Sequence, residues 1–254
     1  MGSEARVEAR QQLGRVRTSE PGILVVELPS WPGHAPGQFA MLTLDASGTS
    51  VDPLLPRPMA VFRGDADGLE FRYKVVGRGT ARMAALRAGA ELGVLGPLGR
   101  GFPAIDGPAV LVGGGTGIAS LYEIAARAGS SARVLLGART RDEVLALDAF
   151  RALDARIEVV TEDGSEGTRG RVTDRLEPKA DEAVYACGPT AMMRAAYAIA
   201  RAAGARCWVS LESPMACGVG VCLGCAVPTQ NGFRYVCTHG PVFDGRDLVW
   251  EGLP

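Results

Sequence analysis

The sequence predicts an N-terminal all-β barrel, a Rossmann-like α/β nucleotide domain with a parallel sheet, and a small cysteine-rich C-terminal subdomain. Three observations support this fold class. Up to about Gly101, short apolar or alternating runs are separated by Pro and Gly, as is typical of barrel strands. From Ala109, apolar runs alternate with helical patterns, which indicates a parallel sheet with right-handed crossovers. After Ser210 the chain becomes rich in Gly and Cys and loses its periodicity.

Composition and charge narrow the possible partners. The chain has 254 residues, of which 47% are hydrophobic, so we expect a packed globular protein. Its 27 basic and 28 acidic residues give a formal net charge of −1, and no long single-sign run offers a surface for nucleic acid or anionic lipid. Residues 1–17 lack the apolar core of a signal peptide, and no later run approaches a membrane span. These features predict a cytoplasmic protein with small-molecule or protein partners.

The elements follow from hydrophobic periodicity. In the first region, strands are expected at 23–28, 39–44, 59–62 and 69–76. Residues 80–87 suit a short helix that ends before Gly89. In the second region, strands are expected at 109–112, 133–137, 157–161 and 183–187, with helices at 118–128, 142–153 and 190–203. The domain boundaries that follow are 1–103, 104–210 and 211–254.

Four of the six cysteines lie close together in the sequence. Cys217, Cys222, Cys225 and Cys237 reproduce the C-x4-C-x2-C…C ligand order of plant-type [2Fe-2S] clusters. In a cytosolic chain a disulfide framework is the weaker interpretation, because glutathione keeps such thiols reduced. A four-cysteine zinc site stays open as an alternative, although zinc ribbons usually present two separate two-cysteine knuckles. Cys207, in an apolar segment, is expected to be a buried small hydrophobe.

Two segments of the first region could hold a flavin phosphate. The first consists of Arg57, Pro58, Met59 and Ala60, and it opens a strand. There a guanidinium can make a two-pronged contact with a phosphate. The second consists of Gly77, Arg78, Gly79 and Thr80, between a strand and a short helix, so its amides and hydroxyl could cradle a pyrophosphate. Each segment alone could also be an ordinary exposed arginine or a glycine turn.

Two segments of the second region could hold a nicotinamide nucleotide. Gly113, Gly114, Gly115, Thr116 and Gly117 follow an apolar strand and precede a helix, the context in which a glycine turn admits phosphates. Cys187, Gly188 and Pro189 end another strand at the sheet edge where ligands of α/β folds bind, which makes Cys187 a candidate neighbour of the nicotinamide. A tight turn without ligand is the alternative for the glycine segment. Arg139 and Arg141 leave NAD and NADP both open.

These segments, in this order, resemble the ferredoxin reductase-like electron transfer subunit of the NAD-linked, two-subunit dihydroorotate dehydrogenases. The resemblance covers nearly the whole chain. Besides the cysteines, it is carried by Arg57-Pro58, Gly77 to Thr80, Gly113 to Gly117, Thr161 to Ser165 with Gly170 to Val172, Cys187 to Pro189, Ser210 to Glu212 and Cys237 to Phe243. Related subunits of other NAD(P)H complexes tend to have aspartate at the position of Cys217, so this cysteine favours the dihydroorotate branch. The chain departs from the family pattern at Ala60, Ser120 and Ser213-Pro214.

The resemblance implies FAD in the barrel, NAD(H) on the second domain and a [2Fe-2S] cluster at the C-terminus. It also implies a partner catalytic subunit that holds FMN and oxidises dihydroorotate to orotate in pyrimidine biosynthesis, in a heterotetramer of two subunits each. One alternative is an NAD(P)H reductase of the same build that serves another oxidoreductase or oxygenase. A second is a zinc-stabilised nucleotide-binding module without redox activity. No hydrolytic triad is indicated, since neither histidine, His34 or His239, lies in a nucleophile motif.

Overall fold

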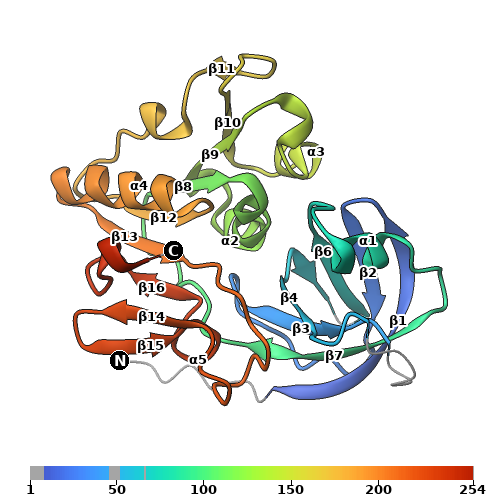
Figure 1. The fold of residues 1–254 in the computed structure, drawn as a ribbon. Helices are drawn as coiled ribbons and strands as arrows, with labels where there is room; N and C mark the ends of the chain where they lie inside the picture. Colours follow the sequence, from blue (N-terminus) through green and yellow to red (C-terminus); the bar gives the residue numbers. More distant parts are fainter. Residues whose placement is uncertain (1–8, 46–51, 66, 254) are drawn as a thin grey trace.

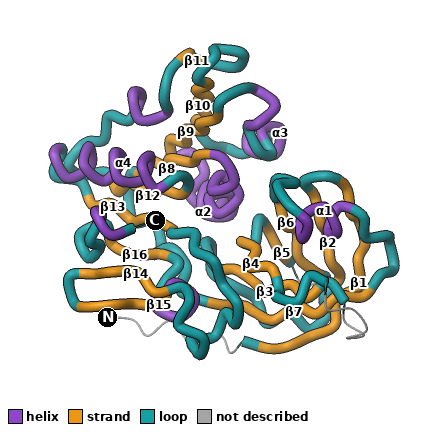
Figure 2. Tube along the Cα trace, in the orientation of Figure 1, coloured by secondary structure: helices purple, strands orange, loops and turns teal. Residues whose placement is uncertain are grey.

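The computed structural model describes residues 9–45, 52–65 and 67–253, and consists of two sheet domains with a cysteine-rich subdomain packed against both (Figure 1). Part of the segment without signal-peptide character, residues 1–8, lies outside the described residues. The strand-rich barrel and the mixed α/β domain are visible as separate blocks of strand and helix (Figure 2). The predicted fold class is therefore confirmed. Among the described residues, none of the helices combines the length and the apolar character needed to cross a membrane.

The N-terminal barrel is built from a seven-stranded antiparallel sheet in the order β4-β3-β7-β1-β2-β6-β5. Its strands are β1 (Arg10–Glu20), β2 (Ile23–Glu27), β3 (Phe39–Thr43), β4 (Arg57–Ala60), β5 (Arg63–Gly64), β6 (Gly68–Arg72) and β7 (Glu91–Leu98), and α1 (Arg78–Ala84) follows β6. Alternate side chains, such as Leu24 and Val26 on β2, point into one apolar core. The sequence pattern missed β1, β5 and β7, and β6 ends four residues earlier than predicted.

The second domain has a seven-stranded sheet in the order β11-β10-β9-β8-β12-β13-β16. All its pairs are parallel except that of β13 with β16. Its strands are β8 (Ala109–Gly114), β9 (Ala132–Ala138), β10 (Arg156–Thr161), β11 (Thr168–Arg169), β12 (Ala183–Cys187), β13 (Arg206–Ser210) and β16 (Val242–Asp244). Chain order reverses between β8 and β12, so the loops after these two strands flank a crevice at the carboxyl edge.

Helices and 3-10 turns cover both faces of this sheet, which is why every residue of β8 is buried. They are η1 (Gly115–Leu121), α2 (Tyr122–Ala128), η2 (Gly129–Ser131), η3 (Arg141–Glu143), α3 (Leu147–Arg151), η4 (Val172–Arg175) and α4 (Thr190–Ala202). The helix predicted at 118–128 begins as a 3-10 turn because the glycine turn leads straight into it. The helix predicted at 142–153 is reduced to η3 and the five residues of α3.

The C-terminal subdomain comprises a cysteine loop, the hairpin of β14 (Ala226–Thr229) and β15 (Gly232–Tyr235), α5 (Val236–His239), β16 and η5 (Trp250–Gly252). It is not a loose appendage. Its strand β16 joins the edge of the nucleotide sheet, and Val236 and Trp250 share an apolar cluster with Val209 of β13.

The barrel and the nucleotide domain are joined by a buried aromatic contact. Phe62, just after β4, is fully buried in the core of the nucleotide domain and stacks on Tyr122 of α2 with ring centroids 4.1 Å apart. Beside it, His34 Nε2 of the barrel lies 2.8 Å from the carboxylate of Glu123, while His34 Nδ1 accepts a hydrogen bond from Trp31. These contacts fix the orientation of the barrel relative to the nucleotide domain, and this orientation determines the shape of the cleft between them.

Candidate functional site

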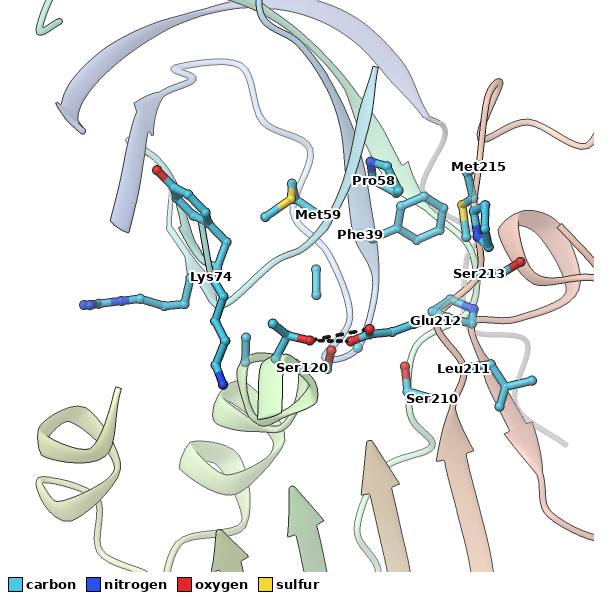
Figure 3. A pocket seen from close by; sticks show the side chains of 18 of the residues that line it. Phe39, Pro58, Met59, Lys74, Ser120, Ser210, Leu211, Glu212, Ser213 and Met215 are labelled. Atoms are coloured by element: carbon cyan, nitrogen blue, oxygen red, sulfur yellow. Dashed lines mark hydrogen bonds between the residues drawn. The ribbon is translucent and has the colours of Figure 1, made fainter. Parts of the chain in front are cut away.

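A cleft of about 440 Å³ opens where the barrel, the nucleotide domain and the start of the C-terminal subdomain meet (Figure 3). Such a volume is typical of a site for one small-molecule ligand or cofactor ring. Three parts of the chain line it. They are the barrel residues Phe39, Pro58, Met59, Ala60 and Lys74, the η1 residues Thr116, Ala119 and Ser120, and the strap from Ser210 to Met215. All three departures from the family pattern therefore line this cleft, Ser213 and Pro214 included.

Beside the cleft, the two segments predicted to bind a flavin phosphate lie in direct contact. A Cβ atom built on Gly79 would lie 2.9 Å from Nη1 of Arg57, so only glycine lets the guanidinium lie against this turn. Nη2 of Arg57 donates to the Leu55 carbonyl at 2.8 Å, whereas Nε is buried and has no hydrogen-bond partner among the described residues. A guanidinium with a buried, unused donor nitrogen fits an anionic group such as a phosphate.

Thr80 holds this turn in shape. Its hydroxyl accepts hydrogen bonds from the amides of Val76 and Gly77, at 3.0 and 3.1 Å, and donates to the Gly77 carbonyl. The hydroxyl is thus occupied within the turn, contrary to its expected role as a phosphate ligand. The donors left for an anion are Arg57 and the amides of the first turn of α1, which have no acceptor within the helix.

Glu212 places a carboxyl group in the wall of the cleft. Its two oxygens lie 3.2 and 3.5 Å from the hydroxyl of Thr116 (Figure 3). The residue keeps solvent-accessible surface because the cleft is open, but protein atoms surround the carboxyl closely. This desolvation raises the pKa of Glu212 above its usual range, and the hydrogen bond from Thr116 offsets only part of the rise. The carboxyl is therefore harder to ionise than an ordinary surface glutamate.

Cys187 lies one layer below the cleft. The side chain is fully buried, and Ser120 and Ser210, both in the cleft wall, are its hydrogen-bonding neighbours. Burial raises the pKa of the Cys187 thiol to about 12, and the nearby Glu212 carboxylate adds to the rise. The thiol is thus neutral and not accessible to a ring in the cleft. The expected direct contact between Cys187 and a nicotinamide is not what this geometry provides.

A second groove of about 490 Å³ runs along the carboxyl edge of the nucleotide sheet. Gly114 and Gly115 line it, and Gly115 has a φ of +57° with open space where a Cβ atom would stand. Gly188, with a φ of +152°, packs against the carbonyl of Gly114, so the two predicted nucleotide segments are in contact. Thr116, the residue after Gly115, already lines the first cleft. A dinucleotide in the groove could therefore extend its other end into the cleft.

The four predicted cluster ligands fall into two pairs in the cysteine loop. Cys217 contacts Cys222, and Cys237 contacts Cys225. Among the residues that the structure describes, no three His, Cys, Asp or Glu side chains converge on a single metal ion. Cys217 of the first pair is also near enough to Cys237 of the second to raise its pKa. Two neighbouring pairs of thiols, two cysteines for each iron, are the ligand arrangement that a two-iron cluster requires.

Backbone amides surround the sulfur atoms of this loop. The amides of Val219 and Cys222 both donate to Cys217 Sγ at 3.4 Å. Although partial burial raises the pKa of Cys217, these hydrogen bonds lower it to about 6 overall. Burial and the neighbouring Cys225 raise the pKa of Cys237 to about 12, against a hydrogen bond from the Gly220 amide. Amides aimed at sulfur are what a cluster with negatively charged thiolates needs.

Glycine lets this loop lie close to its surroundings. Gly218 has a φ of +72°, and a Cβ atom there would lie 2.5 Å from Cγ of Met41 on strand β3. Gly220 has a φ of +83° and lies against Thr238. The loop is therefore pressed onto the barrel, a short distance from the cleft.

Comparison with known proteins places the cysteine loop and the groove within two known domain families. Residues 212–249 match the iron–sulfur cluster binding domain of dihydroorotate dehydrogenase B, and residues 111–198 match the oxidoreductase NAD-binding domain. Over 266 aligned residues, the chain is 38% identical to the dihydroorotate dehydrogenase B (NAD(+)) electron transfer subunit of Geobacillus kaustophilus, covering 98% of this chain and 99% of the relative. This chain belongs to the family of dihydroorotate dehydrogenase B electron transfer subunits. The subunit of that name from Clostridium acetobutylicum is 34% identical over 91% of this chain and 92% of its own length.

Solved structures agree with the family assignment. A chain of the NADH-dependent reduced ferredoxin-NADP oxidoreductase has a TM-score of 0.82 and 31% identity, covering 94% of this chain and 91% of that one. The ferredoxin NADP+ reductase of Neisseria gonorrhoeae, solved with bound FAD and NADP, has a TM-score of 0.63 at 19% identity, over 78% and 93% of the two chains, and shows the shared fold alone. The prediction of an oxidoreductase with flavin, NAD and iron–sulfur sites is confirmed, and the zinc alternative is not favoured.

Several residues of the site were not singled out from the sequence for a role. Lys74 lines the cleft and pairs with Glu143 of the nucleotide domain at 3.0 Å. Glu143 also binds Arg139 at 2.6 Å, so one of the two arginines that left NADP open is already neutralised by a carboxylate. Arg141 is exposed and lies 3.6 Å from Glu166. A charged residue at the end of a predicted strand was the signal available for Lys74, but its partner lies 69 residues away.

Proposed function

We propose that this chain carries electrons between a partner dihydroorotate dehydrogenase subunit and NAD, using a [2Fe-2S] cluster and FAD, during oxidation of dihydroorotate to orotate. When bound, a flavin supplies the exchange between two-electron chemistry at a nicotinamide and one-electron chemistry at a cluster. The residues of the chain have to bind, orient and shield these groups. Family membership supports the reaction, and the geometry supports the role of each segment.

The observation that carries the proposal is the strap between the two redox sites. Residues from Ser210 to Met215 line the cleft, and Cys217, the first proposed cluster ligand, follows two residues after Met215. The loop is fastened to the barrel at Met41. A flavin ring in the cleft and a cluster in the loop would thus be separated by one short segment of chain.

Apart from Thr80 and Cys187, the site residues are proposed in the roles predicted from the sequence. For FAD they are Arg57, Pro58, Met59, Ala60, Gly77, Gly79 and Thr80, with Thr80 shaping the turn. For NAD(H) they are Gly114, Gly115, Thr116, Gly117, Gly188 and Pro189, with Cys187 beneath the site. For the cluster they are Cys217, Cys222, Cys225 and Cys237. We assign residues 1–103 to the flavin domain, 104–210 to the NAD domain and 211–254 to the cluster subdomain.

The substrate-oxidising site belongs, in this proposal, to a partner subunit that holds FMN, in an assembly of two subunits each. A catalytic TIM barrel needs about 250 residues of its own, and the domains described here already account for the chain. The apolar side chains of Val219, Val221 and Leu223 are exposed beside the cluster loop, where such a subunit would approach. We place the reaction in the cytoplasm, where six free thiols remain reduced.

The experiment that tests this function mixes the purified chain, loaded with flavin and cluster, with an FMN-bearing dihydroorotate dehydrogenase subunit. The chain alone should oxidise NADH with an artificial acceptor and show no turnover of dihydroorotate. The mixture should form NADH from NAD and dihydroorotate. Turnover of dihydroorotate by the chain alone would contradict the division of labour, and an inactive cognate mixture would point to a reductase for another oxidoreductase.

A further inference from the structure

The adenosine end of the NAD groove contains an arrangement of charges that the usual rule for dinucleotide folds does not predict. In such folds an acidic residue after the second strand of the sheet reads the ribose, whereas an arginine there accommodates a 2′-phosphate. Here the second strand, β9, is followed by Arg139, and Arg139 lines the groove. By that rule alone, the chain would be read as an NADP enzyme.

Two contacts remove Arg139 from this role. Its Nη2 lies 2.6 Å from one oxygen of Glu143, and its Nε donates to the other at 3.2 Å. The Nε–Nη2 edge of the guanidinium is therefore used by Glu143. Glu143 is held in turn by Lys74 of the barrel at 3.0 Å. A bidentate contact of this kind fixes the direction of the guanidinium. A 2′-phosphate that approached the same edge of the guanidinium would have to displace Glu143.

The acidic residue comes instead from the next strand. The amide of Glu162, directly after β10, donates to the carbonyl of Ala138 at 3.1 Å, which fastens the β10 loop to the β9 loop. Glu162 therefore lines the groove beside Arg139. Within the described part of the chain, no hydrogen bond or ion pair engages its carboxylate. Its neighbour Asp163 is not equivalent, because that carboxylate is bound to the amide and hydroxyl of Ser165 at 2.9 and 2.6 Å.

The charges that line the groove also balance. Its cations are Arg139 and Arg171, and its anions are Glu143 and Glu162. A groove for a 2′-phosphate needs an excess of positive charge, because the phosphate brings up to about two negative charges at neutral pH. A groove for an unmodified ribose needs an acceptor for its hydroxyl groups. The lining meets the second requirement and not the first.

Building on the proposed function, we propose that Glu162 reads the adenosine ribose: its carboxylate accepts hydrogen bonds from the ribose hydroxyls of NAD(H) and repels the 2′-phosphate of NADP(H). Glu143 acts with it as a positioning residue that keeps Arg139 engaged. Discrimination thus depends on two carboxylates from two different loops, and the arginine after β9 serves as a partner of Glu143.

The test measures binding of NAD⁺ and NADP⁺ to the oxidised, flavin- and cluster-loaded chain by titration calorimetry, so that no electron transfer is involved. The wild-type chain should bind NAD⁺ more tightly. Glu162→Gln should shift the ratio of the two dissociation constants toward NADP⁺ by about tenfold or more, the factor expected when one charge-assisted hydrogen bond is lost. Glu143→Gln should tighten NADP⁺ binding and leave NAD⁺ binding nearly unchanged, because it releases Arg139.

The matched control is Glu158→Gln. Glu158 lies on the same strand as the Glu162 loop, but it pairs with Arg175 at 2.6 Å and does not line the groove, so its replacement should leave the ratio unchanged. Retained flavin absorbance shows that each variant is folded. An unchanged ratio of dissociation constants in Glu162→Gln would overturn the role given to Glu162 and leave the proposed electron-transfer function intact. A wild-type chain that binds neither nucleotide would contradict the proposed function, and this assignment with it.

Discussion

Arg57 and Gly79, 22 residues apart in the sequence, lie so close together that a Cβ atom on Gly79 would stand 2.9 Å from the guanidinium and 3.0 Å from Cδ of Arg57. Each belongs to a segment that alone would be an unremarkable turn or strand end. Their contact forms a small concave site, and the buried Nε of Arg57, which has no hydrogen-bond partner among the described residues, is available there to an acceptor. Arg57 begins β4, Gly79 lies in α1 just after β6, and β4 contacts β6 where the barrel closes.

Arg57→Ala should weaken flavin binding by about 1.5 to 3 kcal/mol, because a charge-assisted contact to a phosphate is lost. Gly79→Ala should weaken it by displacing the same guanidinium, while its effect on the free energy of unfolding stays small. Flavin release on dilution and gel filtration measures both. Arg17→Ala, which removes only an exposed pair with Glu27, is the control. Equal flavin retention in Arg57→Ala and Arg17→Ala would show that Arg57 is not a phosphate ligand.

Cys222→Ser should remove or destabilise the cluster and leave flavin bound, because it takes one thiolate from a four-ligand set and the barrel is untouched. Iron and flavin contents of the purified variant are the measurement. Cys207→Ala is the matched control, since Cys207 is a buried thiol on β13 that is not in the proposed ligand set. Full iron content in Cys222→Ser would remove Cys222 from the ligand set.

Glu212→Gln should change how stability depends on pH. Desolvation raises the pKa of Glu212 in the folded chain, so the folded state binds the proton more tightly than the unfolded state, whose carboxyl has a pKa of about 4.3. Wild-type stability should therefore fall as pH rises from that value through the raised pKa, and Glu212→Gln should lack this fall. Denaturant unfolding across this pH range measures it. Parallel pH curves for the two proteins would show that Glu212 titrates normally.

Phe62→Ala should destabilise the chain by about 3 to 5 kcal/mol, the usual result of emptying a buried aromatic site. Phe62 is the barrel residue inserted against Tyr122 of the nucleotide domain. Phe233→Ala is the control, because Phe233 is 68% exposed and surface changes usually stay within about 0.5 kcal/mol. Urea unfolding compares the two variants. If both unfold at the same urea concentration, the aromatic contact does not hold the domains together.

The sequence by itself determined the fold class, the order of the domains and the family. Hydrophobic periodicity is a local property, so each strand that it predicted, such as β2, β3 and β12, is present to within a few residues, as is helix α4. The cysteine spacing is also local, since one loop carries three of the four ligands. The prediction failed where tertiary contacts outweigh local pattern. Strands β1 and β7 are stabilised by pairing with each other, and β16 by its place at the edge of a distant sheet.

Only the tertiary structure decided which predicted residues meet and what each side chain can reach. It brought Arg57 to Gly79, buried Cys187 below the cleft, and used the Thr80 hydroxyl within its own turn. It also paired Arg139 with Glu143 and left Glu162 facing the groove. The physical reason is that burial and hydrogen bonding depend on neighbours from distant parts of the chain. The residue type determines what chemistry a side chain can perform, and packing determines which side chains remain available to a ligand.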